Sequence, residues 1–170
     1  MIEITAKIEG GGNARVAGRV ELPFELRQKR WLFARLASGE EVSLRLPRGK
    51  PLRGGDLLAA SDGRVIEVVA VPEKVMHVEC ATPDELARVA YHLGNRHVPV
   101  QIGAGFLRLI EDPVLEVMLR GQSAKITFID APFEPEAGAY SGAHHRETDA
   151  VRSPDKKIHE YGGVSGNRRR

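Results

Sequence analysis

The fold is decided by residues 76–110, MHVECATPDELARVAYHLGNRHVPVQIGAGFLRLI, where strand and helix patterns follow one another closely. Alternate apolar residues from Met76 to Cys80 form one face of a strand. Residues 82–85 (TPDE) then supply an N-cap, a proline at the first helical position and the glutamate of a capping box. The apolar residues of 86–93 fall at i, i+3, i+4 and i+7, and Gly94 follows as a helix stop. This stretch therefore predicts a strand followed by an amphipathic helix.

The same alternation continues to residue 129. Residues 98–102 and 106–110 predict two strands around a glycine turn, which together make a hairpin. Asp112 and Pro113 cap a second helix that ends at Gly121, and residues 124–129 supply a last strand. The order is βαββαβ, the ferredoxin-like split arrangement, with two helices on one face of a four-stranded antiparallel sheet. Its other face is expected to stay free for a partner.

The chain before this region is expected to be a small all-β domain. Alternating apolar residues in 2–8, 42–46 and 65–71 lie between glycine-rich turns, as in a sandwich or barrel, while residues 24–37 fit a helix or a strand equally well. From Gly138 onward the sequence has no Leu, Phe, Trp or Met, which predicts a disordered tail. The predicted class is α+β, with domains at 1–74 and 75–137 and a tail at 138–170.

Composition excludes several classes of protein. Of 170 residues, 42% are hydrophobic and 28% charged, so neither a membrane protein nor a wholly disordered one is expected. Glutamates near the N-terminus replace the basic residues of a signal peptide, which favours the cytoplasm. The single cysteine, Cys80, excludes an internal disulfide. Residues 1–137 hold 18 Lys and Arg against 19 Asp and Glu, a balance that argues against a nucleic-acid binder.

Histidines are the main candidates for chemistry. His92 falls on the polar side of the first helix and His77 on the second face of its strand, which suits surface residues. His97 follows the helix stop at a surface turn, where a side chain projects freely; from composition alone it is either a solvent-facing residue or a metal ligand. His144 and His145 are adjacent in the tail and can reach one metal ion. Gly-x-Ser-x-Gly, P-loop and His-Glu-x-x-His motifs are missing, so an enzyme is not expected.

Seven short stretches carry a resemblance to a known family when they are taken together. They are LPRG at 46–49 with LRGGDLL at 52–58, GNRH at 94–97 with PVQI at 99–102, DPVL at 112–115 with ML at 118–119, and PFEPEAGAY at 132–140. In this combination the chain resembles the UreE family of urease accessory proteins, the nickel metallochaperones, over nearly its whole length. In that family a peptide-binding β-rich domain precedes a ferredoxin-like metal-binding domain.

The resemblance implies that His97 is the Ni(II) ligand at a homodimer interface, where it faces its mate from the second subunit. The His-rich tail of the family is represented by His144 and His145, with His159 a distant addition. Ni(II) would be bound as cargo, and Zn(II) or Cu(II) can substitute for it. The implied partners are the urease apoprotein and its accessory proteins, including the GTPase, with no nucleic acid and no membrane. Some family members carry extra histidines just before the second helix. This chain has IEDP at residues 110–113 instead, so an additional metal site of that type is not expected.

Two other classes share the predicted topology. An RNA-binding module needs aromatic residues on its central strands, where only Phe106 is available beside Arg108. A hydrolase of the acylphosphatase type could use Asn95 and Arg96, but residues 81–83 lead straight into the helix without an anion-binding loop. A nickel titration separates the chaperone from both.

Overall fold

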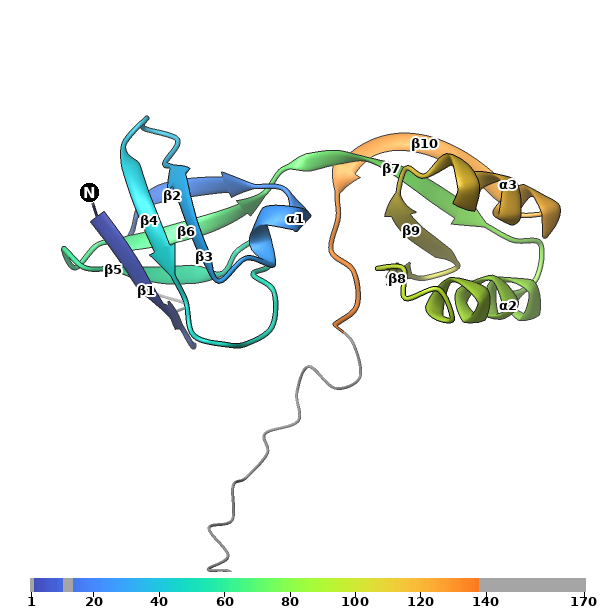
Figure 1. The fold of residues 1–170 in the computed structure, drawn as a ribbon, viewed down its shortest axis with the longest axis horizontal. Coiled ribbons are helices and arrows are strands. Elements are labelled where there is room, and N and C mark those ends of the chain that lie inside the picture. Colours follow the sequence, from blue (N-terminus) through green and yellow to red (C-terminus); the bar gives the residue numbers. More distant parts are fainter. Residues whose placement is uncertain (1, 11–13, 138–170) are drawn as a thin grey trace, which may run out of the picture.

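The computed structural model describes residues 2–10 and 14–137, and it has the predicted α+β class. Two sheets follow one another along the chain (Figure 1). The first is six-stranded and comes from the N-terminal residues. The second is four-stranded and carries two helices. The predicted tail at 138–170 lies outside the described residues.

The first sheet has the strand order β2-β6-β5-β1-β4-β3. β1 lies between β5 and β4, and it runs parallel to β4 and antiparallel to β5. The first strand of the chain therefore pairs with two segments that are distant in sequence. An antiparallel bridge between Val20 and Leu36 brings the two outer strands together at one point, which curls the sheet toward a barrel. Buried aliphatic side chains such as Ile4, Leu44 and Ile66 fill its interior. Its elements are β1 (Ile2–Ile8), β2 (Val16–Leu22), α1 (Phe24–Arg27), β3 (Trp31–Arg35), β4 (Glu41–Arg45), β5 (Leu57–Ala60) and β6 (Val65–Ala70).

The second sheet has the order β10-β7-β9-β8, and each neighbouring pair is antiparallel. Its elements follow the predicted order βαββαβ along the chain. Buried residues of both helices, among them Leu93 and Leu119, pack with Met76, Val78 and Leu109 of the strands. The elements are β7 (Pro72–Glu79), α2 (Pro83–Gly94), β8 (Gln101–Gly103), β9 (Phe106–Ile110), α3 (Pro113–Gly121) and β10 (Lys125–Pro132).

Both helices begin at the predicted caps. The Thr82 hydroxyl accepts from the Glu85 amide at 3.2 Å, and the Glu85 carboxylate accepts from the Thr82 amide at 3.2 Å, which completes the capping box of α2. Asp112 caps α3 by accepting from the amides of Val114 and Leu115 at 2.8 and 2.9 Å. Local side-chain chemistry therefore sets where each helix starts.

The structure differs from the predicted pattern at one strand and resolves one segment that the sequence left ambiguous. The strand expected at 98–102 is β8, which begins only at Gln101, because Pro99 has no amide to donate to a ladder. The ambiguous residues 24–37 contain both a helical turn, α1, and the strand β3.

The prediction that the second face of the four-stranded sheet is free is wrong at one end. Val75 points to that face, yet it is fully buried because Phe24 and Phe133 pack against it. The two aromatic rings meet edge to face with centroids 5.2 Å apart. Phe24 belongs to α1 and Phe133 follows β10, so this cluster joins the two sheets.

Among the described residues, no helix is both long and apolar enough to cross a membrane.

Candidate metal centre

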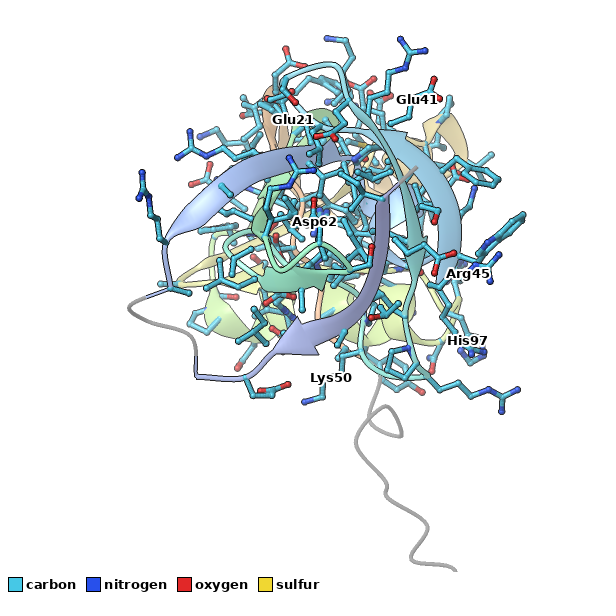
Figure 2. The ribbon with its side chains drawn as sticks, turned by 90° about the vertical axis from the view of Figure 1, so that its left-hand side faces the viewer. Glu21, Glu41, Arg45, Lys50, Asp62 and His97 are labelled. Carbon is cyan, nitrogen blue, oxygen red and sulfur yellow. The ribbon has the colours of Figure 1, made fainter. Side chains whose placement is uncertain are left out.

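His97 lies on the turn between α2 and β8, where the chain leaves the helix. Its amide donates to the carbonyl of Gly94 at 2.9 Å, and the amide of Val98 donates to that of Leu93 at 3.3 Å. The turn is thus tied to the last turn of α2, while the His97 side chain is exposed. Figure 2 shows this side chain at the outer margin of the view. A fixed backbone here presents an accessible imidazole.

The backbone of His97 is in the left-handed region, with a φ of 55°. In the described part of the chain, Ser123 is the only other non-glycine residue with a positive φ. This conformation costs a residue with a Cβ about 1–2 kcal/mol, whereas glycine adopts it freely. The sequence places a glycine stop at Gly94, but Gly94 is the last helical residue and the left-handed position comes three residues later. Ser123 ends α3 with the same conformation and the same two hydrogen bonds, so both turns are helix C-caps of the kind that glycine usually occupies, and one of them presents an exposed histidine.

A hollow of about 490 Å³ opens beside His97. It lies between α1 and the segments on either side of the β8–β9 hairpin, so both sheets contribute to it. Its wall combines four carboxylates with apolar side chains: Glu25, Glu73, Glu111 and Asp112, and Phe24, Val98, Pro99, Ile110, Leu115 and Phe133.

Two of these carboxylates already have backbone partners. Asp112 caps α3, and a Glu73 oxygen accepts from the Phe24 amide at 2.7 Å. Within residues 2–10 and 14–137, no group of three or more His, Cys, Asp or Glu side chains could hold a metal ion. One imidazole fills only part of a coordination shell. The described residues therefore supply one imidazole and no complete protein ligand set at His97.

The other sequence candidates lie elsewhere. His92 is exposed on the last turn of α2, as predicted. His77 lies on the second face of the four-stranded sheet, where its Nδ1 accepts from Arg108 Nε at 3.3 Å and its ring packs against Phe106 with centroids 4.6 Å apart. His144, His145 and His159 lie outside the described residues. The structure places neither described histidine in a metal-ligand group with His97.

Cys80 is also a poor candidate ligand. The thiol is partly buried at the end of β7, and burial raises its pKa, with a smaller contribution from the charge of Glu85. A raised pKa keeps the thiol protonated near neutral pH, and metal ions bind the thiolate. This environment suits a structural thiol better than a metal ligand.

Sequence reasoning missed Arg27, which is only 2% exposed and lies where the two sheets meet. Its Nη1 donates to Glu134 Oε1 at 3.0 Å and to the Leu52 carbonyl at 3.2 Å, and its Nη2 donates to the Phe133 carbonyl. The segment around residue 27 is amphipathic and ambiguous, and the partners lie 25 and more than 100 residues away. The PFEPE stretch could have indicated a buried partner, because Glu134 stands there between Phe133 and Pro135.

Comparison with known proteins identifies relatives along the whole chain. Residues 2–71 match the N-terminal domain of the UreE urease accessory protein, and residues 73–162 match its C-terminal domain. The chain is 50% identical to the urease accessory protein UreE of Azotobacter vinelandii over 146 residues, which cover 84% of this chain and 88% of that protein.

Other relatives carry the same name. The protein of Pseudomonas savastanoi pv. phaseolicola is 47% identical over 167 residues, or 95% of this chain and 98% of that protein. The protein of Nitrosospira multiformis is 48% identical over 137 residues, or 80% of this chain and 78% of that protein. These names describe accessory proteins and not enzymes. The matches cover both sheets and the His97 turn, and the chain therefore belongs to the UreE family of urease accessory proteins.

Proposed function

We propose that this protein is a cytoplasmic, homodimeric nickel metallochaperone that delivers Ni(II) to the urease apoprotein while its nickel active site is assembled. The observation that carries the proposal is the exposed, left-handed His97 beside a hollow with carboxylates in its wall. The names of the relatives support a role in urease maturation.

The ligand set would be shared between subunits. Neutral imidazole is a good ligand for nickel, copper and zinc. A two-fold axis near His97 would bring two imidazoles to one ion, and His144 and His145 from the tails would complete the shell with water. An ion bound at such an open, exchangeable site is held as cargo and can be passed on.

Selection of nickel would depend on geometry and on the receiving partner. Affinity alone would favour copper over nickel in a site of nitrogen ligands. Zn(II) and Cu(II) would therefore compete for the same ligands. The expected partners are the urease apoprotein and the other accessory proteins, among them the GTPase that passes nickel onward. The RNA-binding alternative finds no counterpart among the matched families.

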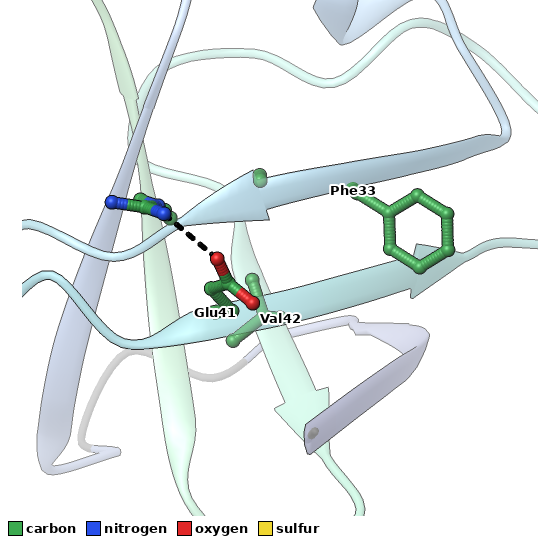
Figure 3. Close-up of a pocket in the computed structure, with 5 residues that line it drawn as sticks. Phe33, Glu41 and Val42 are labelled. Carbon is green, nitrogen blue, oxygen red and sulfur yellow. Dashed lines mark hydrogen bonds and ion pairs between the residues drawn. The ribbon is translucent and has the colours of Figure 1, made fainter.

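The functional division would follow residues 1–74, 75–137 and 138–170, with peptide binding in the first unit. One observation favours peptide binding: Trp31 and Phe33 are 58% and 61% exposed on β3, an outer strand of the first sheet. Their ring centroids lie 5.2 Å apart. Phe33 also lines a hollow of about 460 Å³, together with Glu41 and Val42 (Figure 3). Trp31 is the single tryptophan of the chain, so its fluorescence reports directly on an extended peptide added at β3.

Nickel titration calorimetry with native mass measurement tests the main proposal. We expect one tight site per dimer in the native chain, lost in His97→Ala and kept in His92→Ala. His92 is a matched control because it is also exposed and lies on the last turn of α2, five residues before His97. Tight binding that survives His97→Ala with the fold intact, or a native chain that binds no nickel, would contradict the proposal.

A further inference from the structure

The PFEPE stretch of residues 132–136 crosses from one sheet to the other after the last strand. We infer that it is a strap, defined here as residues 133–136, which Arg27 and Arg53 anchor so that the following chain starts beside the His97 turn. This inference rests on the proposed nickel function for its consequence, but its anchoring is a property of the described residues alone.

On the side of the first sheet, the strap is held by a charged network. Arg27 Nη1 and the Gly54 amide both donate to Glu134 Oε1, at 3.0 and 2.9 Å. Arg53 Nη2 donates to the Pro135 carbonyl at 3.0 Å, and its Nη1 lies 3.6 Å from Glu134 Oε2. Hydrogen bonds in which the donor or the acceptor is charged are the stronger class in proteins.

Breaking this network would cost free energy because Arg27 is a buried charge. The guanidinium is almost fully buried, and Nε also donates to the Leu22 carbonyl at 3.2 Å, so it gains partners from three separate segments. A second carboxylate, Glu73 at the start of β7, lies 3.9 Å away. A buried guanidinium that lost Glu134 would keep few partners able to neutralise it. The strap is therefore favoured in the position where Glu134 pairs with Arg27.

On the side of the second sheet, the strap is held next to the metal centre. The Glu134 amide donates to Gln101 Oε1 at 3.0 Å, and the Glu136 amide donates to the Val100 carbonyl at 2.9 Å. Val100 is only three residues after His97. The last described residues of the chain thus run beside the strand that continues from the His97 turn.

This placement brings the point at which the tail begins close to the proposed metal site. His144 is eight residues beyond Glu136, a contour of at most about 29 Å at ~3.6 Å per residue. A tethered ligand gains effective concentration when its anchor lies close to the site. Arg27 and Glu134 are positioning residues in this account, acting on His144 and His145 through the strap.

Hydrogen exchange tests the anchoring without any metal. We expect the Glu136 amide to be protected in the native chain and to exchange at least about tenfold faster in Arg27→Gln, because the strap then opens locally. Glu134→Ala is a second variant, which removes the carboxylate of the strap while Arg27 keeps its carbonyl partners. Glu41→Ala, which breaks the exposed pair with Arg35, is the control and should leave Glu136 unchanged. Equal exchange in all four chains would overturn the strap.

A double-mutant cycle tests the link to nickel. In the native background, replacing both His144 and His145 by alanine should weaken nickel binding about tenfold; in the Glu134→Ala background the same replacement should change it less than twofold. An equal loss in both backgrounds would show that the strap does not position the tail. If the native chain binds no nickel, the proposed function fails, while hydrogen exchange still decides the anchoring.

Discussion

The contact between the two sheets, formed by Arg27, Phe24 and Phe133 and called the join here, differs from the His97 turn in burial and in hydrogen bonding. At the join, Arg27 is buried, each of its nitrogens donates a hydrogen bond, and Phe24 and Phe133 pack around it. At the turn, His97 is exposed and its backbone is strained, and no group of metal-ligating side chains surrounds it within the described residues. Stability is concentrated at the first place and chemical availability at the second, so substitutions should separate the two.

The largest effect is expected at the join. Arg27→Met removes a buried guanidinium, which leaves three backbone carbonyls without their donor and Glu134 without one of its partners, and should lower the free energy of unfolding by about 3–5 kcal/mol. Urea unfolding followed by circular dichroism measures this change. Arg35→Met, at an exposed ion pair with Glu41, is the matched control and should change the free energy by less than about 1 kcal/mol. Equal effects of the two substitutions would remove the contrast between a structural join and an ordinary surface.

The next effect is on nickel affinity at the turn. A free imidazole titrates near ~6.5 and must lose its proton to bind a metal ion, so affinity should fall as the pH decreases. For two imidazole ligands the loss between pH 7.5 and 5.5 is about 100-fold, and for one it is about tenfold. Calorimetric titrations across this range measure the loss of affinity and so give the number of imidazole ligands. A flat profile would instead indicate carboxylate ligands, because free carboxylates titrate near ~4, below this range.

A smaller effect is expected at the start of the helix that carries His97. Thr82→Ala removes the side-chain half of the capping box and should lower the free energy of unfolding by about 1 kcal/mol. Nickel affinity should stay within about twofold, because the cap and His97 are at opposite ends of α2. Urea unfolding and calorimetry measure the two quantities. A large loss of affinity would show that the turn depends on the whole helix.

The same contrast explains what sequence reasoning could predict. The elements of the second sheet were predicted in the right order because caps such as Thr82 and Asp112 act on amides within three residues of themselves. The exposure of His97 followed from its position after the helix. The positive φ of His97 was not predictable, because the sequence offers Gly94 as the expected stop.

Long-range pairing limited the prediction for the rest of the chain. In the first sheet, β1 pairs with β4 and β5, and β2 pairs with β6, over separations that local patterns do not encode. Arg27 and Glu134 are 107 residues apart, and nothing near either residue identifies the other. The buried Val75 was missed for the same reason, since its covering residues come from α1 and from the strap.

The central claim is that His97 binds metal and is retained at some cost to stability. His97→Gly tests both halves in one variant, through nickel calorimetry and urea unfolding measured together. Glycine adopts the left-handed conformation freely, so the account predicts loss of the tight nickel site together with a free energy of unfolding unchanged or raised by about 0.5–1 kcal/mol. A variant that keeps tight nickel binding, or one that unfolds more easily by 1 kcal/mol or more, would contradict the account.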